Sequence, residues 1–233
     1  MTRRAAAVLT CALAALSPAR AEEPPPKAAG AGDCGAATAA RVQERYDGIR
    51  ALRARFTQTN RNVAFGDSGT APDAESRGRV EFAKPGRMRF EYESPEPSLV
   101  VSDGKTLWIY DPTAKEVQEL PVSGGFLSAA AVQFLLGEGR LEETFAVTAE
   151  SCAADRVVLD LRPRAEAAYE RIEISVDPKT GWIRETTVFD LLGNRTHLAF
   201  SDLEPNAPAP AERFRFDPPD GVRVLKLEAE PPR

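Results

Sequence analysis

A regular alternation of apolar and charged side chains is the feature that most constrains this chain. In Leu52–Thr57, Arg77–Phe82 and Arg87–Glu93, every second residue is apolar or small, and the residues between them are mostly charged. Successive side chains of a β-strand point to opposite faces, so each segment is a strand with one dry and one wet face. Such one-sided wetting is typical of antiparallel sheets, whereas the buried strands of parallel sheets read as continuous apolar runs.

Short turns join these strands and others like them. Asp103-Gly104 separates Leu99–Val101 from Leu107–Tyr110, which is a hairpin signal. Further strands are expected at Phe145–Ala149, Arg156–Leu161, Glu170–Val176, Trp182–Phe189 and Arg195–Ser201, with a last apolar edge within Phe214–Leu225. About 11 strands in consecutive hairpins, without helical crossovers, predict a mainly β fold with some α-helix, built on a single curved antiparallel sheet.

Two helices are expected to cover the dry face of this sheet. Ala36–Ile49 places apolar side chains at offsets of three and four, including Val42 and Tyr46, and so forms an amphipathic helix. Ala129–Leu136 is apolar almost throughout, with Ser128 as its cap and Gly137 as its stop.

The N-terminus has the form of a signal peptide. Two arginines precede the apolar run Ala5–Leu16, and the small-residue pattern Ala19-Arg20-Ala21 follows, which predicts a signal peptide over residues 1–21. The run is shorter than the ~20 residues that span a bilayer. Residues 22–33 are rich in Pro, Gly and Ala and predict a flexible tether, so that one domain is expected over 34–233.

Charge and cysteine content limit the partners and the compartment. Acidic side chains outnumber basic ones by 35 to 30, and no basic stripe is evident, so nucleic acid is not an expected partner. Cys34 and Cys152 remain after export. An even count in an oxidising compartment favours a disulfide between them, and two free thiols are the open alternative.

Few residues suggest catalysis. His197 is the one histidine and falls on an expected strand. Ser68 lies in Gly66–Gly69, which is similar to the nucleophile segment of chymotrypsin-like proteases, but that family places its histidine upstream. Asp177 and Asp190 flank turns, where carboxylates usually cap backbone amides. We therefore expect no catalytic residue, metal or cofactor, and a hydrolase using Ser68 and His197 is the enzymatic alternative.

The remaining candidates for a functional site are the apolar residues on the dry face of the predicted sheet, together with one residue of the second predicted helix. Composition alone would assign these residues to an ordinary core. They are Phe56, Val80, Phe82, Met88, Phe90, Tyr92, Leu107, Ile109 and Phe134.

Taken in order, several segments resemble the periplasmic outer-membrane lipoprotein carrier family, LolA. They are Phe56–Gln58, Gly78–Phe82, Lys84–Tyr92, Val101–Pro112 and Phe214–Val222. The resemblance covers about Arg41–Leu225 and implies an unclosed β-barrel, with helices acting as a lid over an apolar cavity lined by the dry-face residues. Family members carry an arginine where this chain has Lys84. The resemblance implies that Lys84 latches the lid by donating to its carbonyls, without the planar fork of arginine.

The resemblance also implies a function. The protein would be a periplasmic carrier that ferries triacylated lipoproteins from an inner-membrane ABC lipoprotein-release complex to an outer-membrane receptor or to the outer membrane. We expect it to work as a monomer and without a cofactor. The alternative is a regulatory binding protein of the same fold that senses lipids or lipoproteins in the periplasm.

Overall fold

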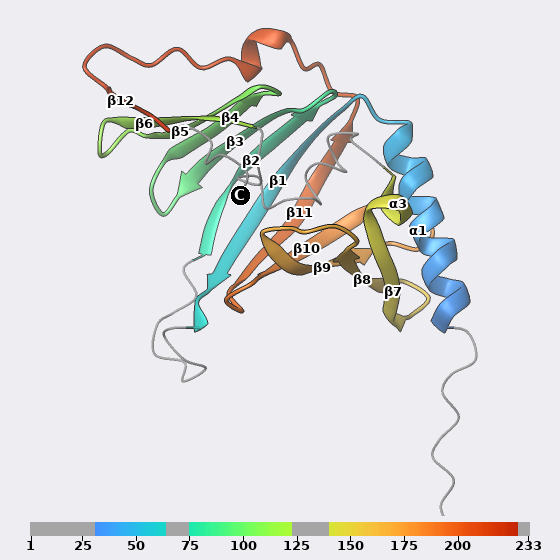
Figure 1. The fold of residues 1–233 in the computed structure, drawn as a ribbon. Coiled ribbons are helices and arrows are strands. Elements are labelled where there is room, and N and C mark those ends of the chain that lie inside the picture. The colour runs from blue at the N-terminus through green and yellow to red at the C-terminus, as the bar shows by residue number, and fades with distance from the viewer. Residues whose placement is uncertain (1–30, 64–74, 123–139, 228–233) are drawn as a thin grey trace, which may run out of the picture.

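The computed structural model describes residues 31–63, 75–122 and 140–227 of the chain, which form one sheet with a long helix beside it (Figure 1). The helical elements are α1 (Ala31–Asp47), α3 (Leu141–Thr144) and the 3₁₀ helix η2 (Ala211–Phe214). The strands are β1 (Ala51–Arg61), β2 (Glu75–Ala83), β3 (Arg87–Ser94), β4 (Ser98–Asp103), β5 (Thr106–Asp111), β6 (Glu116–Pro121), β7 (Phe145–Cys152), β8 (Val157–Pro163), β9 (Tyr169–Val176), β10 (Ile183–Asp190), β11 (Arg195–Pro205) and β12 (Arg223–Lys226).

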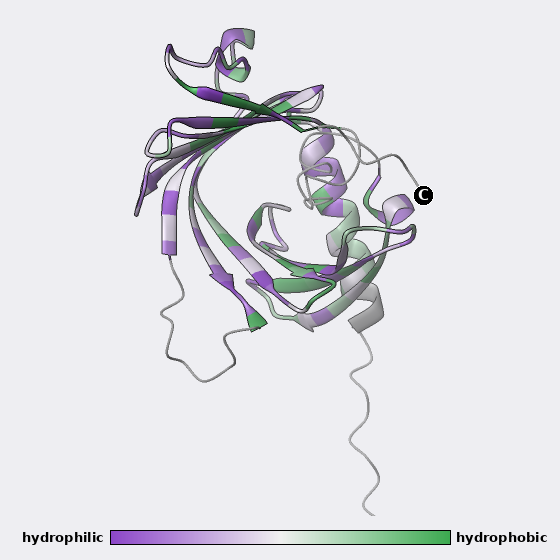
Figure 2. Cartoon of the chain, turned by 60° about the vertical axis from the view of Figure 1, so that its left-hand side comes forward, coloured by the Kyte–Doolittle hydropathy of each residue, from purple (hydrophilic) through white to green (hydrophobic). Residues whose placement is uncertain are grey.

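The twelve strands formed by the described residues belong to one sheet, in the order β12-β6-β5-β4-β3-β2-β1-β11-β10-β9-β8-β7. Neighbouring strands are antiparallel, except that β12 runs parallel to β6. Figure 2 shows the sheet curled into an incomplete ring, with α1 beside β7. The predicted single, curved and unclosed sheet is therefore confirmed.

The hydrophobic core lies on the concave face of this sheet. The strand register places Ala54, Val80 and Phe90 side by side on that face, while Arg53 and Glu81 pair on the opposite face. One buried cluster joins apolar residues of β1–β3 with those of β8 and β9 and with α1. The alternation in the sequence thus produces a sheet that is apolar inside and charged outside.

Helix α1 closes part of the concave side. Its buried residues Ala39, Val42 and Tyr46 follow the predicted helical spacing, and the helix packs against β7 and β8. It begins at Ala31, within the predicted tether, and ends at Asp47. Residues 1–30, with the predicted signal peptide and most of the tether, lie outside the described residues. The predicted helix Ala129–Leu136 does too.

Strand β6 is absent from the sequence-based prediction, which gave about 11 strands rather than twelve. Its buried residues, Val117 and Leu120, are three positions apart, so they show no period of two. They point to opposite faces of the strand, and both are buried because the outer face is covered here as well.

The cover is the C-terminal strap, residues 206–227. It crosses the outer face near β3 and β4 through η2 and then adds β12 to the sheet edge at β6. Phe214, the last residue of η2 in the strap, is fully buried. Arg213 forms ion pairs with Glu81 and Glu91, and the ring of Phe216 packs against Tyr110 of β5. The strap explains why both faces of β4–β6 bury apolar residues.

Candidate functional site

The sheet brings the described dry-face residues of the first half of the chain together. Two rows of cross-strand neighbours run along the concave face from β1 to β5. The first contains Ala54, Val80, Phe90, Val100 and Ile109, and the second contains Leu52, Phe82, Met88, Ser102 and Leu107. Phe56 and Tyr92 extend the face on either side of Gly78. Phe134 lies outside the described residues.

Aromatic rings form the centre of this face. Phe56 meets Phe90 and Tyr92 edge to face, with ring centroids 5.3 and 5.1 Å apart, and Phe82 meets Phe90 at 5.7 Å. Gly78 makes this packing possible, because a Cβ there would lie 3.0 Å from the Phe56 ring and 2.0 Å from the carbonyl oxygen of Glu91. The sequence pattern therefore places a glycine where the rings approach the backbone.

Accessibility varies along the face. Phe56, Val80, Phe82, Met88, Phe90 and Leu107 are buried, whereas Tyr92 and Ile109 are half-buried. The hydroxyl of Tyr92 donates to Oε1 of Gln58 at 2.9 Å, and burial raises the pKa of this phenol. Among the described members of the predicted set, Tyr92 and Ile109 are thus the ones that a bound molecule could reach with the least rearrangement.

The apolar face continues into the second half of the sheet, which the sequence analysis left out of the candidate site. Phe200 of β11 is the cross-strand neighbour of Phe56, and Leu198 is the neighbour of Gln58. Both are half-buried and pack against the core cluster. The alternation within Arg195–Ser201 predicted the strand that carries these two residues. Only the pairing of β1 with β11 shows that they lie next to Phe56 and Gln58.

Lys84 lies where the end of α1 meets the sheet. Its ammonium group donates a hydrogen bond to the backbone carbonyl of Tyr46, in the last turn of α1. Desolvation lowers the pKa of Lys84, and the nearby carboxylate of Asp47 opposes that shift. A helix C-terminus leaves carbonyl groups without partners in the helix, so a cation there satisfies one of them and interacts favourably with the helix dipole.

Other contacts hold α1 along its length. A disulfide joins Cys34 near its start to Cys152 at the end of β7, with Cα atoms 6.5 Å apart. At the other end of the helix, the backbone N–H of Ile183 donates to the hydroxyl of Tyr46 at 3.4 Å, and the ring of Tyr46 meets Trp182 edge to face. Burial raises the pKa of the Tyr46 phenol.

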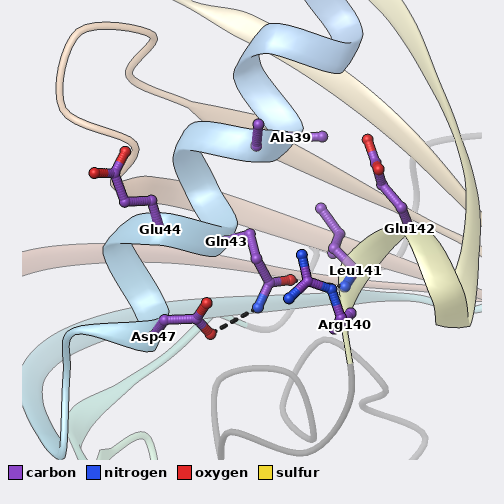
Figure 3. Close-up of a pocket in the computed structure, with 8 residues that line it drawn as sticks. Ala39, Gln43, Glu44, Asp47, Arg140, Leu141 and Glu142 are labelled. Atoms are coloured by element: carbon purple, nitrogen blue, oxygen red, sulfur yellow. Dashed lines mark hydrogen bonds between the residues drawn. The ribbon is translucent and has the colours of Figure 1, made fainter.

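A pocket of about 310 Å³ lies between α1 and α3 (Figure 3). Within it, Gln43 donates to the carboxylate of Asp47 at 2.7 Å and accepts a hydrogen bond from the backbone N–H of Leu141 at 2.8 Å. Five of its eight lining residues carry polar or charged side chains, namely Gln43, Glu44, Asp47, Arg140 and Glu142, and the other three are Ala39, Ala40 and Leu141. Its side chains join the two helices, and the pocket lacks the apolar continuity of the sheet face.

The residues considered for catalysis and metal binding have structural contacts. His197 lies on the outer face, where Nδ1 is 3.0 Å from Oγ1 of Thr187. Ser68 lies outside the described residues. Elsewhere on the outer face, the carboxylates of Glu150, Asp160 and Glu173 come close enough to hold an ion.

The guanidinium of Arg171 pairs with each of these three carboxylates, at 3.0 Å from Asp160 and 3.7 Å from Glu150. It also lies 3.6 Å from the ring centroid of Phe189. Arg171 therefore already supplies the positive charge that the group requires.

Comparison with known proteins agrees with this geometry. Residues 47–217 match the family described as "Outer membrane lipoprotein carrier protein LolA". The chain belongs to this family. An outer-membrane lipoprotein carrier protein of Chromobacterium violaceum is 32% identical over 191 residues, which cover 82% of this chain and 88% of that protein. One of Methylibium petroleiphilum is 34% identical over 182 residues, covering 76% and 83% of the two chains.

A solved structure shares the fold at low sequence identity. An uncharacterized conserved protein from Thermus thermophilus superposes with a TM-score of 0.50 and 13% identity, covering 82% of this chain and 97% of that one. Members of the carrier family are periplasmic, and the predicted periplasmic location of this chain is confirmed. Within the described ranges, no helix is long and apolar enough to cross a membrane.

Proposed function

We propose that the protein binds lipoprotein acyl chains on the concave face of its sheet and carries them through the periplasm without catalysing a reaction. The observation that carries this proposal is the continuous apolar face across β1–β5 in a member of the lipoprotein carrier family. Acyl chains are insoluble, and each buried CH₂ contributes about 0.8 kcal/mol. A carrier therefore needs a broad apolar surface rather than a few polar groups.

Release requires that the bound state can open. In the proposal, Lys84 helps to hold α1 against the sheet through its bond to the Tyr46 carbonyl. One charge-assisted hydrogen bond is strong enough to favour a closed state and weak enough to be broken when a partner binds. We further propose that loading occurs at an inner-membrane ABC complex and delivery at an outer-membrane receptor.

Ile109→Glu tests the site. Ile109 is half-buried on the concave face, so a carboxylate there can reach water and the fold should be retained. An acyl chain would have to desolvate that charge, which is costly. We expect the variant to release at least about tenfold less lipoprotein from inner-membrane vesicles into soluble complex, with its unfolding midpoint little changed.

Thr57→Glu is the matched control. Thr57 is also half-buried, but its cross-strand neighbours are Arg77 and Ala199 on the outer face, so an added carboxylate meets a cation rather than cargo. This variant should extract lipoprotein as the wild type does. Equal extraction by Ile109→Glu and the wild type would refute the assignment of cargo to the concave face. Mass spectrometry of copurifying material that finds no acylated protein would count against the carrier role itself.

A further inference from the structure

We propose that the turn between β10 and β11 docks the protein onto the surface of a phospholipid bilayer. Three exposed apolar residues meet there and form what we call the apolar tip: Val63, Leu191 and Leu192, which are 51%, 68% and 78% exposed. The backbone N–H of Val63 donates to the side-chain oxygen of Asn194 at 3.1 Å, so the end of β1 lies against the turn (Figure 1). The tip thus gathers residues from two distant parts of the sequence.

The two leucines are not needed for the conformation of the turn. Asp190 accepts hydrogen bonds from the backbone N–H groups of Leu192 and Asn194, each at 2.8 Å, and Gly193 adopts a φ of 88°. Turn positions usually carry Gly, Pro, Asn, Asp or Ser. Because Asp190 and Gly193 define this turn, the side chains at 191 and 192 could be polar without structural cost. Grouped exposed apolar side chains mark interaction sites.

The shape of the tip favours a bilayer as its partner. A stable protein interface buries roughly 1,000 Å² or more of complementary surface. A protruding turn with three aliphatic side chains offers far less area, but it can enter hydrocarbon, which adapts to any shape. Residues that lie at a membrane surface combine an apolar part with adjacent cations that face the headgroups.

Arginines lie at the base of the tip. Arg61 and Arg195 are direct cross-strand neighbours at the ends of β1 and β11, and the guanidinium of Arg195 lies 5.3 Å from the ring centroid of Phe189. Basic residues next to a membrane are attracted to anionic headgroups.

The tip lies far from the C-terminal end of α1. The backbone N–H of Lys84 donates to the carbonyl of Arg50, just before β1 begins, whereas the tip adjoins the far end of β1. β1 spans 11 residues, which corresponds to about 35 Å of extended chain. A protein docked by its tip would therefore keep the end of α1 away from the membrane. The proposal requires no cargo and goes beyond the carrier role.

Vesicle flotation with the full mature chain tests the proposal. The wild type should bind cargo-free vesicles of phosphatidylethanolamine and phosphatidylglycerol, and L191S/L192S should bind at least about tenfold more weakly. L191F/L192F should retain binding. Arg195→Gln should weaken binding to these vesicles but not to vesicles of phosphatidylcholine, because only the former are anionic. Leu227→Ser, which alters another exposed leucine (42%), should behave as the wild type.

Thermal unfolding of each variant checks that its fold is retained. Absence of wild-type binding, or equal binding by L191S/L192S, would overturn the proposal. So would an equal loss with Leu227→Ser, which would indicate general stickiness. A wild-type dimer in sedimentation velocity that L191S/L192S abolishes would assign the tip to a second copy of the chain instead. Because the vesicles contain no lipoprotein, these outcomes are independent of the carrier function.

Discussion

At the scale of single residues, Asp190 shows which polar roles the sequence can reveal. A carboxylate beside a turn was expected to cap backbone amides rather than to transfer protons, and Asp190 accepts bonds from Leu192 and Asn194. Burial raises its pKa, but the hydrogen bonds from Asn194, Leu192 and Gly193 outweigh burial and hold the pKa below its usual value. This role is local, so the residue and its neighbours in sequence are enough to predict it.

Asp190→Ala should therefore destabilise the protein in a pH-dependent way. Removing the acceptor costs about 1 kcal/mol at neutral pH, the usual net value of such hydrogen bonds. Since the folded-state pKa is lowered, the contribution is present above the unfolded pKa of about 3.9 and is lost as pH falls through the folded pKa. Urea unfolding of the variant and the wild type should differ at pH 7 and converge in acid. A difference that persists unchanged in acid would argue against the ionised carboxylate as the cause.

At the scale of elements, local patterns succeed where only one face is buried. Alternation predicted β1–β3 because their outer faces are charged. It missed β6, whose outer residue Val117 is buried on the face that the C-terminal strap covers. No pattern within Glu116–Pro121 reports that a segment much later in the chain will cover it. For the same reason the pairing of β1 with β11, which extends the candidate site to Phe200, could not be predicted.

Helix α1 is the element whose attachment depends most on a covalent bond. The disulfide between Cys34 and Cys152 joins residues 118 positions apart, and the chain-entropy model gives such a link roughly 4 to 5 kcal/mol as an upper value. We expect reduction to lower the free energy of unfolding by up to that amount, as measured by denaturant titration with and without reductant.

Cys34→Ser with Cys152→Ser provides the control for this experiment. The double variant should match the reduced wild type and should not respond to reductant. Thiol titration of the unreduced wild type under denaturing conditions should find neither cysteine reactive. If both react, or if the double variant is as stable as the oxidised protein, the bond does not stabilise the mature fold.

At the scale of the whole molecule, the first and second halves of the sheet meet only along β1 and β11, and the rest of the described ring stays open. Helix α1 spans part of this opening, fixed to β7 by the disulfide and to the sheet near β2 by Lys84. The family resemblance suggested a contact between Lys84 and lid carbonyls, but not which helix would supply the carbonyl. That depends on the long-range curl of the sheet, which neighbouring residues in sequence do not encode.

Lys84→Met tests whether this contact controls the opening. The variant keeps the aliphatic stem and loses the donor, so the Tyr46 carbonyl loses its partner while most packing remains. A hydrogen bond to a charged group contributes about 1.5 to 3 kcal/mol, which would raise the population of an open form roughly 10-fold or more. We expect faster amide hydrogen exchange in the last turn of α1 and a smaller amount of soluble lipoprotein complex at equilibrium. The global unfolding midpoint should shift only modestly.

Lys84→Arg is the matched variant, because a guanidinium can donate to more than one carbonyl at once. In this variant, amide exchange in the same turn should be as slow as in the wild type or slower, and cargo should be held at least as firmly as by the wild type. Relative to the wild type, Lys84→Met should therefore speed amide exchange in α1, whereas Lys84→Arg should slow it or leave it unchanged. If Lys84→Met leaves both the exchange in α1 and lipoprotein retention at wild-type values, the bond to Tyr46 is merely a surface contact. The opening of the carrier would then have to be governed by other contacts of α1, such as those of Tyr46 with Trp182 and Ile183.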